Sequence, residues 1–313
     1  MDAQELRPIV SGLFAGSSTR TTRVGVEQEL LVADAAGRTV PVPRLRALLA
    51  GCPLAAYVAY EPGGQLELNL PPSDSPASAE VQLRVSLRDV RDHLERAGVR
   101  ITADPVDPRP EREVPLRLRS PRYAAMQRHF DTIGPAGRRM MRRTASTQLC
   151  LDWWPGQAGA EQWRALHLVA PFLAARYARS TGPESRLATW LAVDPARTAF
   201  DGRLLAGDDP VSAYVDLALG ATRFVDGGPA DHLTTLFPPV RPRGRYLEVR
   251  FLDAQPTSAV GEIAATLGGI LYDAERRHRV LRRLKPMAGR LDELWAAAAA
   301  GDLADHGPSE VAA

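Results

Sequence analysis

The sequence predicts an α+β fold in which helices flank an antiparallel sheet. Strand-like alternations are mixed with amphipathic helical patterns, and the two do not follow the regular strand–helix repeat of a doubly wound sheet. The chain has 313 residues, of which 45% are hydrophobic, so it can bury a large core. We expect one domain over residues 1–302 and a disordered tail at 303–313. Strands are expected at 23–33, 56–70, 144–153 and 245–253, and helices at 78–98, 122–131, 160–179, 210–222, 258–284 and 290–300.

The first predicted strand carries two glutamates on one face. In the stretch VGVEQELLV, Glu27 and Glu29 are two residues apart, so their side chains point to the same side of a strand, and apolar side chains cover the other side. Two neighbouring carboxylates repel each other unless water, a basic group or a cation separates them. The stretch therefore fits either an exposed edge strand with a solvated acidic face or a strand that holds a divalent ion.

The second predicted strand adds two more carboxylates. Leucines alternate with polar residues in QLELNL, and this places Glu67 between two amides on the polar face. The preceding Pro62-Gly63-Gly64 is typical of a turn, and it presents Glu61 at the mouth of the strand.

The third and fourth predicted strands repeat this pattern. The third has Gln148 and Cys150 on its polar face, and the fourth has Glu248 and Arg250 on its polar face. A sheet with one solvated face would explain any of these alternations singly. Four together predict that five carboxylates meet on one surface.

The helical stretches are predicted from their apolar spacing. The best example is 78–98, where leucines and a valine form one stripe and charged residues lie opposite. The Pro/Arg-rich stretch at 104–122 is expected to be a long surface connection, because each proline removes a backbone donor and disfavours helix before it.

Composition excludes several classes of protein. The chain has 39 basic and 37 acidic residues, and this balance favours neither nucleic acid nor an anionic membrane as a partner. Two cysteines are too few for a disulfide framework, the N-terminal stretch lacks the pattern of a secretory signal, and no apolar run approaches a membrane span. We expect a cytoplasmic protein. The phosphate-binding G-x-x-x-x-G-K-[ST] loop and the G-x-S-x-G nucleophile motif are both absent from the sequence.

The predicted carboxylate surface suits a hard divalent ion. Carboxylate oxygens with hardly any histidine or thiolate nearby favour Mg²⁺, or Mn²⁺, over zinc. Clusters of such ions hold the phosphates of ATP against anionic substrates. Arginines that could pair with phosphate or carboxylate are Arg143, Arg186, Arg241, Arg243 and Arg250.

Several blocks of sequence resemble one enzyme family. GVEQEL, EPGGQLEL, RYAAMQRHF, GRRMMRRTASTQLCLD and HLTTLFPPVRPRGRYLEVRFLDAQP, in this order between about residues 23 and 257, are similar to the glutamate-cysteine ligase family. The likeness is to the branch shared by plants and bacteria, and particularly to the actinobacterial ligases of ergothioneine biosynthesis.

The resemblance implies a catalytic domain with a fold like that of glutamine synthetase, in which a curved antiparallel sheet binds Mg-ATP and glutamate. It implies that ATP phosphorylates the γ-carboxylate of glutamate and that the amine of cysteine attacks the γ-glutamyl phosphate, giving γ-glutamylcysteine. By resemblance, the metal ligands are Glu27, Glu29, Glu61, Glu67 and Glu248, the nucleotide-binding residues are Gln148 and Arg250, and the catalytic residues are Arg250 and Arg186. Arg143, which precedes the third strand, is a further candidate for nucleotide binding.

The sequence also departs from the family pattern. Cys150 stands where the family usually has asparagine, and the connections at 179–186 and 224–232 are short. These departures leave two alternatives open beside the leading interpretation. One is a carboxylate-amine ligase of the same family with a different amine or acid as substrate, and the other is a non-catalytic nucleotide-binding paralogue.

Overall fold

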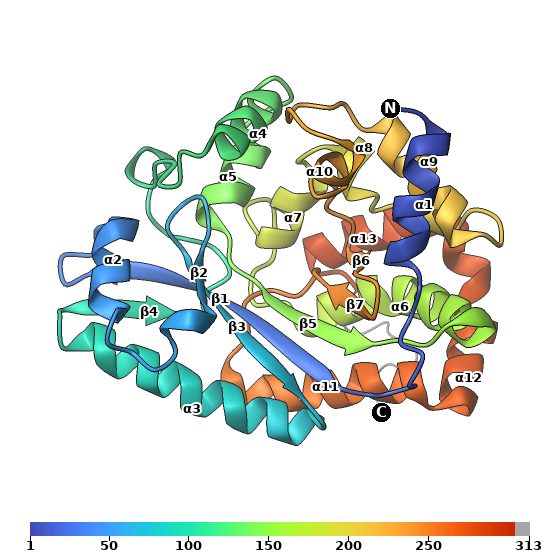
Figure 1. Cartoon of the computed structure of the whole chain (residues 1–313), viewed down its shortest axis with the longest axis horizontal. Helices are drawn as coiled ribbons and strands as arrows, with labels where there is room; N and C mark the ends of the chain where they lie inside the picture. The colour runs from blue at the N-terminus through green and yellow to red at the C-terminus, as the bar shows by residue number, and fades with distance from the viewer. Residues whose placement is uncertain (304–313) are drawn as a thin grey trace.

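A computed structural model describes residues 1–303, in which helices pack against a central sheet (Figure 1). The strands of the described residues form one open sheet in the order β2-β3-β1-β5-β7-β6, with β4 paired to the end of β1. All of the pairings are antiparallel, as predicted. The strands are β1 (Val24–Asp34), β2 (Val58–Tyr60), β3 (Leu66–Ser73), β4 (Val99–Thr102), β5 (Thr147–Asp152), β6 (Val240–Pro242) and β7 (Tyr246–Val249).

The helices were only partly predicted. Those expected at 78–98, 122–131, 160–179, 210–222 and 290–300 are present with slightly different ends. The α-helices are α1 (Ala3–Leu13), α2 (Val42–Leu49), α3 (Pro76–Glu95), α4 (Pro121–Asp131), α5 (Ala136–Arg143), α6 (Gly156–Arg176), α7 (Arg186–Leu191), α8 (Pro195–Thr198), α9 (Pro210–Gly220), α10 (Pro229–Leu233), α11 (Thr257–Tyr272), α12 (Ala274–Leu284) and α13 (Leu291–Ala300).

The single helix expected at 258–284 is wrong, because the chain breaks at Asp273 into α11 and α12. The backbone of Asp273 is extended, and its carboxylate accepts hydrogen bonds from the amides of Glu275 and Arg276. This N-cap satisfies amides at the start of a new helix, so the chain can change direction there.

The central strand β1 explains why the alternation of polar and apolar residues in the sequence indicated the two faces of the sheet. Its register places Glu27 opposite Asn69 on β3 and Gln148 on β5, and it places Glu29 opposite Glu67. Cross-strand partners share a face, so the polar side chains of three strands come together. The leucines and valines of the same strands lie on the other face in the main core, where most are less than 5% exposed.

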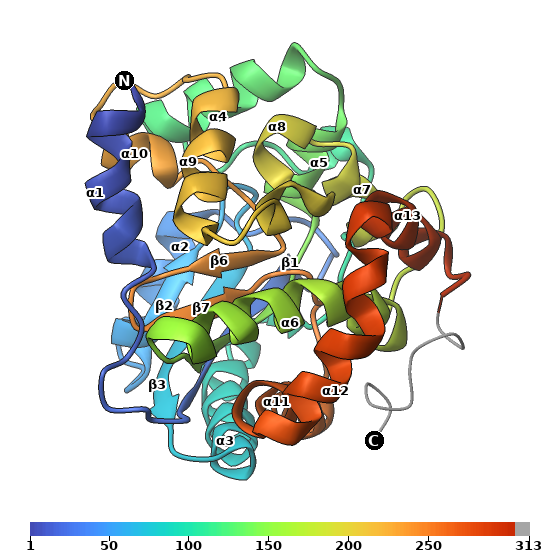
Figure 2. The same ribbon diagram turned by 90° about the vertical axis from the view of Figure 1, so that its right-hand side faces the viewer.

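Helices cover both faces of the sheet (Figures 1 and 2). Helices α3, α11 and α12 lie on one side, beneath the apolar face, while α4, α5 and α7 to α10 lie on the other side. The second group stands above the polar face, and its helices α4, α5 and α7 form a smaller core that includes Met126, Phe130, Trp190 and, from a later segment, Phe237. The polar face of the sheet is therefore roofed rather than fully solvated.

The predicted surface connection at 104–122 is largely irregular, with a short 3-10 turn at Glu111–Glu113. Leu303, which was expected in the tail, is buried in the main core, and the rest of the expected tail, 304–313, lies outside the described residues. None of the helices between residues 1 and 303 combines the length and the apolar character that crossing a bilayer requires. The cytoplasmic location stays a prediction.

Candidate active site

A cavity of about 310 Å³ lies between the polar face of the sheet and the helices above it. Its lining includes all five of the carboxylates that the sequence singled out, on β1, β3, β7 and the turn before β3. The other charged or polar lining residues are Gln65, Asn69, Arg122, Tyr123, Thr144, Gln148, Thr234, Arg241, Arg243 and Arg250. The cavity therefore has an acidic part and a part rich in arginine.

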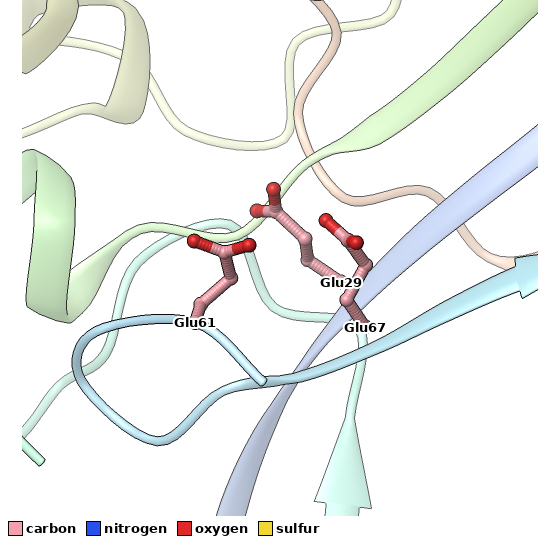
Figure 3. Close-up of side chains that lie close together, drawn as sticks. All are labelled: Glu29, Glu61 and Glu67. Atoms are coloured by element: carbon pink, nitrogen blue, oxygen red, sulfur yellow. The ribbon is translucent and has the colours of Figure 1, made fainter. Parts of the chain in front are cut away.

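Glu29, Glu61 and Glu67 form the acidic part and point toward one another (Figure 3). Carboxylate oxygens of the three residues all lie within 4.8 Å of one another. Glu29 and Glu67 meet because they are cross-strand partners. Glu61 reaches them from the turn that precedes β3.

That turn depends on two glycines. Gly64 has φ of +92°, which L side chains rarely adopt, and its amide donates to the carbonyl of Glu61 at 2.8 Å. A Cβ on Gly63 would lie 2.2 Å from the carbonyl oxygen of Arg142. The turn thus packs directly against the end of α5, which fixes where Glu61 enters the cavity.

The three carboxylates perturb one another electrostatically. Burial and the neighbouring Glu29 raise the pKa of Glu61 to about 7 from 4.5. Burial and Glu61 raise the pKa of Glu67 well above its usual range, against the hydrogen bond that Asn69 donates to it at 2.8 Å. With a pKa of about 7, the Glu61 carboxyl is partly protonated near neutral pH, and a bound divalent ion would displace this proton.

The arginine-rich part is organised around Glu248, which is 1% exposed. Arg241 donates to both of its carboxylate oxygens, at 2.8 to 3.0 Å, and Arg250 forms a hydrogen bond with Oε1. Arg243 Nε lies 3.6 Å from Oε2. Burial alone would raise the pKa of Glu248, but Arg250 and Arg241 outweigh it and hold the pKa below its ordinary value.

Gln148 joins the two parts of the cavity. Its Nε2 donates to Glu29 Oε1 at 3.1 Å, and its Oε1 accepts from Arg250 at 2.8 Å. The amide of Ser146 donates to the other oxygen of Glu29, at 2.7 Å. The start of β5 therefore fixes Glu29 through one backbone and one side-chain donor.

Glu27 lies between these parts, beside Cys150. The Cys150 thiol is 3.5 Å from Glu27 Oε1, and Cys150 is the cross-strand partner of Glu248. Burial and the proximity of Glu248 raise the pKa of Glu27. Burial and Glu27 likewise raise the pKa of the Cys150 thiol, which keeps it protonated as a weak donor.

Two predicted arginines do not line the cavity. Arg186 is 2% exposed, and its guanidinium donates to the backbone carbonyls of Arg250, at 2.9 Å, and Phe251, at 3.3 Å. Arg143 donates to the carbonyl of Asp107 at 2.8 Å. In this arrangement both side chains hold backbone next to the site rather than face its interior.

The roof of the cavity was not predicted residue by residue. It consists of Arg122, Tyr123 and Met126 on α4, and Met140, Met141, Trp190, Thr234 and Phe237 on later segments. Burial and the nearby Glu61 raise the pKa of Tyr123 to about 12, so the phenol stays protonated and able to donate. The block RYAAMQRHF carried the signal for α4, but its apolar pattern alone does not reveal which residues face the carboxylates.

An open antiparallel sheet that brings clustered carboxylates and arginines into one cavity is compatible with an enzyme of the ligase class, and comparison with known proteins shows that class. The model of glutamate-cysteine ligase family 2 matches residues 23–301. The chain belongs to this family, as the sequence motifs predicted.

Relatives with known names support this assignment. The chain is 33% identical to the glutamate–cysteine ligase EgtA of Mycolicibacterium smegmatis, over 86% of this chain and 74% of the relative. It is 31% identical to EgtA of Mycobacterium tuberculosis, over 82% and 68% of the two chains. It is 26% identical to the chloroplastic glutamate–cysteine ligase of Medicago truncatula, over 72% of this chain and 52% of the relative.

Solved structures share the fold. The glutamate–cysteine ligase of Francisella tularensis, solved in complex with AMP, aligns with a TM-score of 0.56 over 94% of this chain and 75% of that chain, at 15% identity. A bifunctional glutathione synthetase from Pasteurella multocida aligns with a TM-score of 0.50 over 99% and 49% of the two chains, at 14% identity. The predicted α+β class is confirmed, and the protein is a carboxylate-amine ligase by its family.

Proposed function

We propose that the protein uses ATP to join the γ-carboxylate of glutamate to the amine of cysteine, through a γ-glutamyl phosphate. The observation that carries this proposal is that the Glu29–Glu61–Glu67 group and the arginine group around Glu248 line one cavity. Such a cavity can hold the metal-bound phosphates of a nucleotide at one side and anionic groups at the other. The family and the AMP complex of the Francisella ligase support ATP as the nucleotide.

The donor set fits Mg²⁺ or Mn²⁺. Glu29, Glu61 and Glu67 offer oxygen atoms only, their oxygens lie within 4.8 Å of one another, and the pKa of Glu61 is raised to about 7 by burial and by Glu29. These are the features of a site whose negative charge needs a cation. We assign Glu27 and Glu248 to the edge of this site, and the chemistry that a bound divalent ion supplies is neutralisation of phosphate charge.

The arginines would act on the other side of the transferred group. Arg250 is held by Glu248 and Gln148 below, and its guanidinium lies 5.8 Å from the centre of the Trp190 ring. A guanidinium fixed in this way can pair with a phosphate without first being ordered, which is how transition-state charge is stabilised at low cost. Arg186 supports it by holding its backbone carbonyl.

Arg143 would have a less direct role. Its guanidinium is occupied by the carbonyl of Asp107, and its own carbonyl accepts from the amide of Asp107 at 2.7 Å. A contact of Arg143 with nucleotide would require the side chain to leave Asp107.

The test is release of ADP by the purified protein with Mg-ATP and glutamate, first with cysteine and then with a panel of amines. Product masses are read by mass spectrometry. A mass of γ-glutamylcysteine is the expected result, and Glu27→Gln should abolish turnover while circular dichroism shows an intact fold. No turnover with any amine, despite measured nucleotide binding, would refute the proposal.

A second candidate function is ligation of a different amine to a carboxylate. It is favoured by Cys150, a small thiol that stands beside Glu27 where the family resemblance implies asparagine. ADP release that requires another amine, with the corresponding product mass, would identify this alternative.

A further inference from the structure

The roof of the cavity is tied together by one buried arginine outside the cavity lining. Arg197, on α8, is 0% exposed. Its Nε donates to Asp194 Oδ2 at 2.9 Å, which pairs the buried charge. Its two terminal nitrogens form hydrogen bonds with residues 222 and 235, which lie much later in the chain.

Arg197 holds the two ends of the 222–235 segment together. One terminal nitrogen forms a hydrogen bond with the carbonyl of Thr222, and the other donates to Thr235 Oγ1 at 2.8 Å. The backbone carbonyl of Arg197 also accepts from the amide of Phe237 at 3.0 Å. A single side chain thus joins both ends of the segment, and the planar fork of arginine is suited to such a bridge.

The same arginine connects this segment to α4. The Arg197 guanidinium lies 4.3 Å from the centre of the Phe224 ring, and Phe224 also stacks on His129 of α4, with centroids 4.8 Å apart and an interplanar angle of 22°. Arg197 Nε is itself 3.4 Å from His129 Nε2. His129 Nε2 also lies 3.0 Å from Asp194 Oδ2. Phe224 therefore contacts both members of the linked Arg197–His129 pair.

The segment and α4 form a thin partition. Arg122 of α4 donates to the carbonyl of Thr234 at 3.0 Å, and both residues line the active-site cavity. Phe224 and Asp231 line a second cavity of about 720 Å³ on the outer side, which Arg122 also borders. Where the wall has a cavity on each side, few packing contacts fix it, so its position there depends on its anchors, although Met126 and Phe130 of α4 pack in the smaller core.

We propose that Arg197 is a positioning residue, which holds the α4 and 222–235 wall at the distance from the sheet at which substrates bind. This inference rests on the proposed function only for its kinetic readout. When the anchor is lost, the binding-competent position of the wall becomes a minor population, and the apparent affinity falls by that fraction. Chemistry in the bound complex is unchanged, because the carboxylates and Arg250 lie on the strands or directly next to their ends and not on the wall.

The test compares Arg197→Lys with Arg277→Lys. Arg277 is a matched control, because it is also buried, at 3% exposed, and bridges Glu161 and the carbonyl of Leu271 on helices remote from the cavity. Lysine keeps the charge but cannot reach both ends of the 222–235 segment. We expect the KM of at least one substrate to rise about tenfold or more in Arg197→Lys, with kcat at saturation within about threefold, as for a competent state populated at a tenth. Arg277→Lys should leave every KM unchanged.

A second readout does not need turnover. Arg223 is exposed within the segment, so trypsin can cleave there when the segment opens. Cleavage after Arg223, identified by fragment mass, should be faster in Arg197→Lys than in the wild type and the control. Phe224→Leu removes the stacking on His129 and keeps Arg197 paired with Asp194. It should show the same effects more weakly, and it serves as the test variant if Arg197→Lys does not fold. Equal cleavage rates in all of these proteins would overturn the positioning role. If Arg197→Lys is cleaved faster but the wild type shows no ligase turnover, only the proposed function is refuted.

Discussion

Replacing Glu61 by glutamine should stabilise the metal-free protein at alkaline pH, although it removes a proposed metal ligand. The pKa of Glu61 is raised from 4.5 to about 7, by burial first and then by Glu29. At pH 8 the carboxylate is ionised, although its surroundings disfavour the charge. At about 1.4 kcal/mol per pKa unit, a shift of this size means that ionisation costs about 3 kcal/mol more in the folded protein than in the unfolded chain. Glutamine has the same shape and no charge. We therefore expect the free energy of unfolding at pH 8 to rise by up to about 3 kcal/mol.

The direction of the pH dependence follows from the same shift. The folded protein binds this proton more tightly than the unfolded chain does, so the stabilisation is complete below about pH 4.5 and is lost as the pH rises to about 7. The wild type without metal should lose stability across this window. Glu61→Gln should lose less, keeping the slope that comes from Glu67 and Glu27, whose pKa values are also raised by burial and by neighbouring carboxylates.

Urea unfolding followed by circular dichroism, in EDTA at pH 5.5 and pH 8, measures both effects. A titration with Mg²⁺ at pH 8 should then stabilise the wild type more than the variant. Glu113→Gln is a suitable control, because Glu113 is a half-exposed surface residue in a 3.6 Å pair with Arg112 and should change stability by less than about 1 kcal/mol. A Glu61→Gln protein no more stable than the wild type at pH 8, or equally stabilised by Mg²⁺, would refute the three-carboxylate site.

Three further substitutions examine other parts of the site. Arg250→Lys keeps a charge but loses the planar guanidinium, in which Nη1 meets both Gln148 and Glu248 and the other N–H groups can pair with phosphate, so kcat for ADP release should fall about 10²-fold or more with the fold retained, and a fall of less than about threefold would contradict its role. Gly63→Ala places a Cβ 2.2 Å from the carbonyl oxygen of Arg142, so the melting temperature should fall and more Mg²⁺ should be needed for turnover; an unchanged Mg²⁺ requirement would mean that this turn does not set the position of Glu61. Cys150→Asn gives Glu27 a stronger donor than a thiol, which should lower the raised pKa of Glu27 and move the acidic limb of the pH profile of kcat/KM to lower pH, whereas a limb that stays in place would argue against their contact.

The sheet and its five carboxylates could be predicted because strand alternation is local information. The face on which Glu27, Glu29 and Glu67 lie can be inferred from the polar residues two positions away. The same holds for Glu248 and Arg250. Strands β4 and β6 have only four and three residues, and no longer alternation extends beyond them as it does beyond the four residues of β7, so they were not detected. The register that pairs Glu29 with Glu67 follows from the apolar pattern only once the strands are known to be neighbours.

The destinations of the arginines could not be predicted. Arg186 and Arg241 look alike in a sequence with 39 basic residues, yet Arg186 holds backbone carbonyls while Arg241 pairs with both oxygens of Glu248. Which partner a long flexible side chain finds depends on tertiary distances rather than on sequence spacing. Arg197, which organises the roof, gave no sequence signal at all.

The orientation of Gln148 shows how the two halves of the cavity depend on each other. Its amide nitrogen faces the carboxylate of Glu29, and its amide oxygen faces the guanidinium of Arg250, so each end meets a group of the opposite sense. A reversed amide would place its oxygen against Glu29 and its nitrogen against Arg250, losing both hydrogen bonds. The acidic and the arginine-rich groups therefore fix this side chain jointly. The cavity keeps its cation-attracting and anion-attracting sides apart on one rigid sheet, which is the arrangement that bringing a metal-bound phosphate to a carboxylate requires.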